Sequence, residues 1–243
     1  MEEEPSRAER RDNARDQQRK RLFIIGGAVL ALAVIALIVV LVAGGGGNET
    51  ATKKPTASQP IPGTKLTLQL GDVSADSAGP PAQLTPDQAQ AVLNVMRDYL
   101  TIATVQPLRS GKPAGDLAGV FDPTAIATVN GADRGVIVDE GLPKVTGELD
   151  VAAQPVTVVA LADQTGAIQL ATAKLAVDIT GGTNVKGAPL HILRQGDFVL
   201  APDASGAWKV TQYSVTVARS GAGLDPTTTT AATPTTTEKK GSK

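Results

Sequence analysis

The stretch WKVTQYSVTVAR (208–219) carries the strongest fold signal in the chain, because its hydrophobic alternation changes phase part-way along. Trp208 and Val210, at the start of the stretch, occupy even-numbered positions. The later hydrophobic residues occupy odd-numbered positions: Tyr213, Val215 and Val217. Successive side chains of a β-strand point to opposite faces, so a strand with one buried face changes phase only where a residue is inserted. We therefore predict a β-bulge near Thr211 and Gln212, which returns all five side chains to one buried face and bends the sheet.

Helices precede strands in the region 84–219, an order typical of α+β domains. The first helix begins at a Thr-x-x-Gln capping box, Thr85 to Gln88, and we expect Pro107 to end it. Its apolar residues recur every three or four positions and predict one buried face: Val92, Val95, Met96, Tyr99, Ile102 and Ala103. Shorter helices are expected at 114–121 and after Asp122-Pro123.

Alternating segments follow, and they predict a meander of antiparallel strands. The expected strands are 145–151, 155–162, 167–180, 189–201 and 208–219, with Gly181-Gly182 breaking the chain between two of them. We predict a cone-like domain of about three helices packed on a bent antiparallel sheet of four to six strands. Alternating leucines at 64–73 are consistent with one further edge strand.

Residues 22–43 predict a transmembrane helix, because they contain no charged side chain. As a helix they would measure roughly 33 Å, enough to cross a hydrocarbon core of about 30 Å. A cleaved signal peptide is the alternative, but its apolar region is usually about 7–15 residues long. The arginines and lysines of the tail 1–21 place the N-terminus in the cytoplasm and the rest outside it.

Composition divides the remaining chain into a flexible extracytoplasmic linker (44–83), the domain (84–219) and a disordered tail (220–243). The linker is rich in Gly, Pro, Ser and Thr, and the tail reads GAGLDPTTTTAATPTTTEKKGSK from residue 221 onward. Such segments bury too little apolar surface to fold alone.

Composition also argues against several functions. The chain has no cysteine, one histidine and a net charge of −1, so thiolate and histidine-rich metal sites and a basic nucleic-acid surface are not expected. No phosphate-binding glycine loop or nucleophile motif is present, and we predict no cofactor and no metal.

The candidates for acid–base chemistry are few. We interpret His191 as a surface residue or one with a satisfied hydrogen bond, Asp98 as a solvent-facing helix residue, and Asp139-Glu140 as a loop cap or surface pair. The predicted inward strand positions are alanine, leucine, valine and isoleucine, so we predict no catalytic residue. If the cone contains a pocket, the side chains expected to line it are Met96, Tyr99, Trp208 and Tyr213.

The element order, the bent terminal hairpin and the ending GAWKVTQYSVTVAR (206–219) resemble the nuclear transport factor two-like superfamily. An anchor followed by such a domain is also similar to actinobacterial Mce-associated membrane proteins and to inner-membrane assembly proteins of type IV secretion. The resemblance implies a module without catalytic activity that docks into an envelope complex.

Three functions therefore stay open at this point. The leading hypothesis is a single-pass, membrane-anchored extracytoplasmic interaction or scaffold module with envelope proteins as partners. The second is a carrier that holds a lipid or another small molecule in the apolar cone. The third is a small isomerase or dehydratase, which requires a buried aspartate or histidine.

Overall fold

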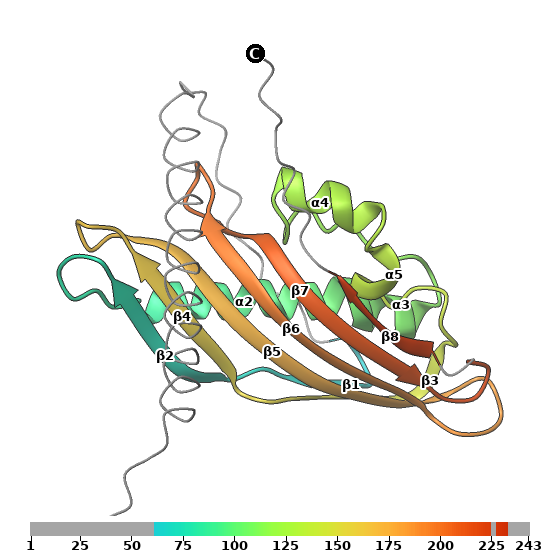
Figure 1. Cartoon of the computed structure of the whole chain (residues 1–243). Helices are drawn as coiled ribbons and strands as arrows, with labels where there is room; N and C mark the ends of the chain where they lie inside the picture. Colours follow the sequence, from blue (N-terminus) through green and yellow to red (C-terminus); the bar gives the residue numbers. More distant parts are fainter. Residues whose placement is uncertain (1–60, 225–226, 233–243) are drawn as a thin grey trace, which may run out of the picture. The chain divides into compact units, whose positions relative to one another are not determined.

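The computed structural model describes residues 61–224 and 227–232, which form an α+β fold with a mixed sheet and a few helices (Figure 1). The strands are β1 (Thr64–Thr67), β2 (Leu70–Ser77), β3 (Val145–Ala153), β4 (Val156–Ala162), β5 (Ile168–Thr183), β6 (Leu190–Pro202), β7 (Trp208–Ser220) and β8 (Thr227–Ala232). The helices are α2 (Pro86–Leu100), a π-helical turn (Thr101–Val105), α3 (Gln106–Ser110), α4 (Pro123–Asn130) and α5 (Arg134–Ile137). The predicted helix 22–43, the tail 1–21 and residues 233–243 lie outside the described residues, among which no helix is long and apolar enough to cross a membrane.

Helix α2 begins as predicted. The Thr85 hydroxyl accepts from the Gln88 N–H, and the Gln88 side chain accepts from the Thr85 N–H, which completes the capping box. The helical turns do not end before Pro107, however, but continue through a π-helical turn into α3 and stop at Gly111. Gly111 has a φ of 70°, the left-handed conformation that glycine adopts without strain.

The predicted helix 114–121 is wrong. These residues form an irregular segment and a turn, and Phe121 makes an isolated parallel bridge to Val210 of β7. Val210 donates to the Val120 carbonyl and accepts from the Asp122 N–H, so β7 takes the backbone groups that a helix would use. Helix α4 follows as predicted, with the Asp122 carboxylate accepting from the Ala125 N–H at 2.6 Å.

The sheet is larger than predicted and is not purely antiparallel. Eight strands join it within the described residues, and β1 and β2 run parallel to β3 and β4. Strands β3 and β4 run in the same direction along β5 and are separated only at Gln154-Pro155. Strands β1 and β2 are separated at Leu68-Gln69 and follow β3 and β4 along the edge. Two strands therefore lie within the range 44–83 that was predicted as a linker, and folded structure begins before residue 84.

The bulge in the closing strand is confirmed. Val199 of β6 pairs with Gln212 and Leu200 pairs with Val210, which leaves Thr211 as the additional residue. The Thr211 hydroxyl donates to the Val199 carbonyl at 3.2 Å. The five hydrophobic side chains on either side of it are all buried: Trp208, Val210, Tyr213, Val215 and Val217.

Strand β5 runs on through Gly181-Gly182, where a break was predicted. Gly181 pairs with Leu149 on one side and with Leu190 on the other. A Cβ atom at Gly181 would lie 2.8 Å from the Val145 side chain, so glycine permits the close approach of β3. At the other end of the sheet β8, within the predicted tail 220–243, pairs antiparallel with β7.

Candidate functional site

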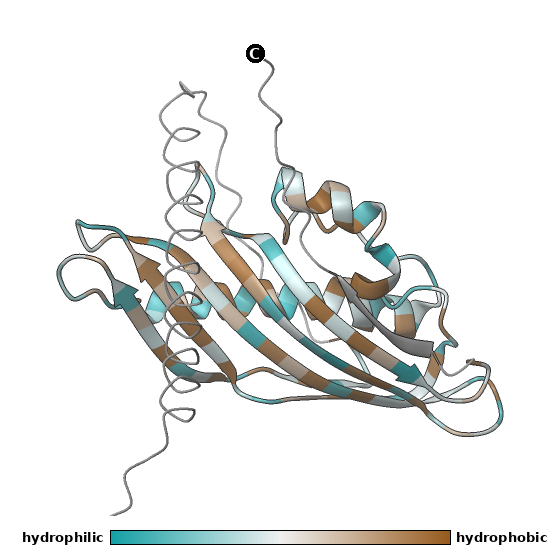
Figure 2. Ribbon diagram, viewed as in Figure 1, coloured by the Kyte–Doolittle hydropathy of each residue, from teal (hydrophilic) through white to brown (hydrophobic). Residues whose placement is uncertain are grey.

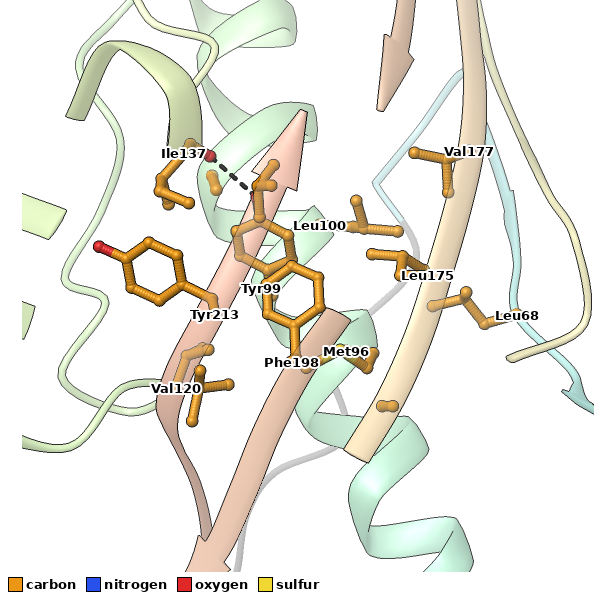
Figure 3. Close-up of a cluster of buried hydrophobic side chains, with 14 of the residues drawn as sticks. Leu68, Met96, Tyr99, Leu100, Val120, Ile137, Leu175, Val177, Phe198 and Tyr213 are labelled. Carbon is orange, nitrogen blue, oxygen red and sulfur yellow. Dashed lines mark hydrogen bonds between the residues drawn. The ribbon is translucent and has the colours of Figure 1, made fainter. Parts of the chain in front are cut away.

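The inner face of the sheet packs on α2 and holds the side chains that were predicted to line a pocket. Met96, Tyr99, Trp208 and Tyr213 are all buried. Tyr99 lies against Phe198 with ring centroids 5.1 Å apart, and Phe121 meets both tyrosine rings edge-on. Figure 3 shows the rings of Tyr99 and Phe198 packed between α2 and the strands. Three hollows in the described residues, one on the outer face of the sheet and two beside β1 and β2, are lined by other side chains.

The inner face is not purely aliphatic, because β6 places Arg194 in it. The side chain of Arg194 is fully buried, and it alternates in phase with Ile192 and Phe198. Its guanidinium lies 5.6 Å from the centre of the Tyr99 ring. Sequence reasoning missed this residue, although the alternation of LHILRQGDF (190–198) was the signal that could have found it.

Asp139 is the partner of Arg194, which corrects its assignment to a surface pair. Its carboxylate is buried, and one oxygen accepts from Arg194 Nη2 at 2.8 Å and from the Thr104 hydroxyl at 2.7 Å. The other oxygen accepts from Arg219 Nε at 2.8 Å. Arg194 also donates to the Thr104 hydroxyl at 2.8 Å, so one carboxylate holds two arginines and a threonine together.

The π-helical turn explains how Asp139 is positioned. In an α-helix the Ala103 carbonyl would accept from the N–H of residue 107, but Pro107 has no N–H. The N–H of Gln106 instead reaches back to Thr101, and the Ala103 carbonyl accepts from the Asp139 N–H at 2.8 Å. Pro107 therefore frees the carbonyl that holds the Asp139 backbone, while Thr104 on the same turn holds its side chain.

The whole segment 133–140 is held across the structure by side chains from α2, β6 and β7. Its polar contacts are Tyr213 to Asp133 (2.7 Å), Arg219 to the Gly135 carbonyl (2.8 Å), Arg194 to the Val136 carbonyl (3.4 Å), and Tyr99 to the Ile137 carbonyl (3.1 Å). Within the segment, Arg134 donates to the Glu140 carboxylate, which also accepts from the Ala114 N–H. The segment is therefore fixed by contacts from residues far apart in sequence.

The polar groups of this network are hydrogen-bonded to one another. Every oxygen of the Asp139 carboxylate already accepts from at least one donor. Burial raises the pKa of the Tyr99 hydroxyl, which the positive charge of Arg194 opposes only in part. Burial also raises the pKa of Tyr213, and its bond to Asp133 adds to the effect. The network therefore has the properties of a structural ion cluster.

The remaining predicted candidates lie elsewhere. His191 is partly exposed on the outer face of β6 and pairs with Asp178 of β5 at 2.8 Å, which confirms its assignment as a surface residue. Asp98 is half-buried on α2. No group of three or more acidic, histidine or cysteine side chains in the described residues is arranged to hold a metal ion.

A polar hollow lies on the outer face of the sheet and was not predicted. It is a groove of about 460 Å³ that crosses β5, β6 and β7 where β3 gives way to β4. Polar side chains from all the strands line it: Gln154, Thr157, Lys174, Gln195, Asp197, Ser214 and Thr216. Lys174 is paired with Asp197 in the sheet register, yet the two side chains form no ion pair. Figure 2 shows hydrophilic and hydrophobic bands alternating along these strands.

Comparison of the chain with known protein families, curated proteins and solved structures finds no match. The resemblances to the nuclear transport factor two-like superfamily and to Mce-associated proteins therefore stay predictions.

Proposed function

We propose that this protein is a non-catalytic interaction or scaffold module, anchored in a bacterial cell membrane by residues 22–43 and acting outside the cytoplasm. The anchor and its orientation rest on the apolar sequence and on the basic residues that precede it. The partners we propose are envelope proteins, as in the membrane proteins that the sequence resembles.

The observation that carries the proposal is the packing of the sheet's inner face. A carrier or a small enzyme of the predicted kind would hold its ligand between α2 and the sheet. Tyr99, Met96 and Phe198 fill that space, and Asp139 directs its oxygens to Arg194 and Arg219. Binding capacity in the described residues therefore lies on the outer surfaces and edges of the sheet.

The finer description of the fold belongs to the same proposal. A long capped helix lies against one face of a sheet that a bulge bends, and this agrees with a cone-like, nuclear transport factor two-like domain (Figure 1). In this arrangement the segment 133–140 would cover one end of the cone, because it contacts both α2 and the strands β6 and β7.

The proposal is tested by capture of partners in cells. The full-length chain and a chain that stops at residue 60 are each expressed with an affinity tag, crosslinked in living cells and purified. We expect defined envelope proteins to be captured with the full chain and lost with the shorter one. Identical captured proteins from both chains would contradict the proposal, and so would a stoichiometric apolar ligand in native mass spectrometry of the purified full-length chain.

A further inference from the structure

Strand β2 forms an edge of the sheet that lacks a partner on one side. It pairs with β4 through register positions from Leu70 to Ser77, and no other described strand pairs with it. An open strand edge presents N–H and C=O groups in a row, which is a template for one more strand. Figure 1 shows β2 at the border of the sheet.

A slot of about 400 Å³ lies beside this edge. Its walls are Val73–Ala75 of β2 and the segment Ala82–Leu84, which leads into α2. The residues Ala82–Leu84 make no backbone hydrogen bond to β2. Pro80 and Pro81 precede them and have no N–H to donate, so the chain itself cannot continue the sheet through these two positions. The slot is therefore bounded by a strand edge that the neighbouring segment leaves open.

The chemistry of the edge indicates which partner fits. Val73 is 41% exposed, one of three large hydrophobic side chains exposed in the described residues. Asp72, at the register shift between Leu70 and Val73, and Asp76 are both exposed on this strand, and neither forms an ion pair within residues 61–224. A segment with two basic side chains would match the charge of the strand.

We infer that β2 binds an extended, basic segment of a partner protein, which adds to the sheet as a further strand in the slot beside Val73. This inference rests on the proposed function and names the docking surface. The segment would pair with the backbone of β2 and place two lysines or arginines against Asp72 and Asp76. A second copy of this chain fits less well, because a β2–β2 pair collects four carboxylates on one short ribbon.

A synthetic probe tests the recognition directly. The probe is the acetylated peptide amide Thr-Lys-Val-Thr-Val-Lys-Thr, and its matched control has glutamates in place of both lysines. Binding to the full-length chain in nanodiscs is measured by fluorescence anisotropy of dye-labelled peptides. We expect the lysine peptide to bind more tightly, and Asp72→Lys with Asp76→Lys to weaken it by about tenfold while favouring the glutamate peptide.

Two controls separate the edge from other surfaces. Asp178→Lys adds a positive charge on the outer face of β5 and should leave peptide binding unchanged. A proline at the central threonine of the peptide should weaken binding, because a strand pair loses a backbone donor there. Equal binding of lysine and glutamate peptides, or no response to the Asp72 and Asp76 variants, would overturn the inference.

Crosslinking in cells distinguishes failure of this inference from failure of the proposed function. A photoreactive residue is placed at Val73, and another at Gln195 in the outer groove. We expect a defined partner from Val73. A partner captured from Gln195 alone would overturn the β2 site but would leave the proposed interaction function standing. A second copy of this chain captured at Val73 would overturn the inference that β2 binds a different protein. If neither position captures a protein, the result would count against both the β2 site and the proposed function.

Discussion

Strand β6 makes two side-chain contacts of equal length to aspartates on opposite faces of the sheet, and they have very different consequences. His191 meets Asp178 at 2.8 Å on the outer face, where the two side chains are 40% and 51% exposed. Arg194, three residues later, meets Asp139 at 2.8 Å on the inner face, where both side chains are 0% exposed. Water solvates the first pair if it separates, whereas separation of the second would leave a charge in the core.

The difference shows that distance alone does not identify an important contact. The Arg194–Asp139 pair also involves Thr104 and Arg219, and it joins the π-helical turn to β6 and β7. A buried charge pair of this kind need not stabilise a fold more than apolar side chains would, but removing one member is costly. We therefore expect the buried cluster to determine whether the segment 133–140 keeps its place.

The largest effect should follow from Asp139→Asn. The substitution keeps the shape of the side chain but leaves the Arg194 guanidinium buried without its counter-ion, at a cost of about 3–5 kcal/mol in the free energy of unfolding. Asp178→Asn is the matched control on the outer face and should cost less than about 1 kcal/mol. Urea unfolding followed by the fluorescence of Trp208, the single tryptophan, measures both. Equal losses of unfolding free energy from the two variants would contradict the claim that the buried contact matters more than the exposed one.

A smaller effect is expected when both members of the buried pair are replaced. Arg194→Met combined with Asp139→Leu removes both charges and keeps apolar volume in the core, while Arg219 retains some access to water. The double variant should therefore be more stable than Asp139→Leu alone by more than about 1 kcal/mol.

A double-mutant cycle on the outer pair gives the reference value. His191→Gln and Asp178→Asn, singly and together, should show a coupling below about 0.5 kcal/mol. If the double variant in the core were the least stable of the set, the cost would arise from lost packing or hydrogen bonds and not from an unpaired charge.

Local signals in the sequence predicted the elements that depend on neighbouring residues. The capping box at Thr85 and the bulge at Thr211 both follow from a few adjacent side chains, and both are confirmed. The phase change in the strand 208–219 was sufficient because a buried face tolerates no other arrangement.

The buried cluster escaped prediction because its members are far apart in the chain. Asp139 and Arg194 are 55 positions apart, and an arginine or an Asp-Glu pair suggests a surface when its partner is unknown. Pro107 suggested a helix end, since nothing local shows that a π-helical turn and the Asp139 N–H replace the lost bond. The parallel strands β1 and β2 depend in the same way on partners about 85 positions away.

The ion pair between Arg134 and Glu140 is intermediate in exposure between the two contacts of β6, and its strength should depend on pH. Both side chains are partly exposed, and Arg134 Nη2 donates to Glu140 at 2.8 Å. The hydrogen bond from Arg134 lowers the pKa of Glu140, burial opposes this, and the Ala114 N–H adds to the lowering. A carboxyl group with a lowered pKa in the folded state stabilises the fold above its unfolded pKa, and that stabilisation is lost as the pH falls through the folded pKa.

Glu140→Gln should therefore reduce stability at neutral pH and flatten the decline in stability below about pH 4.3, the ordinary pKa of a glutamate. The measurement is a series of urea midpoints between neutral and acidic pH, again from Trp208 fluorescence. Glu148→Gln is the matched control, because Glu148 pairs with Lys65 at a more exposed edge of the sheet. Parallel acid profiles for the unaltered chain and Glu140→Gln would mean that the contact adds nothing to folding. A profile flattened by Glu140→Gln and not by Glu148→Gln would show that the segment 133–140 depends on this partly exposed pair as well as on the buried cluster.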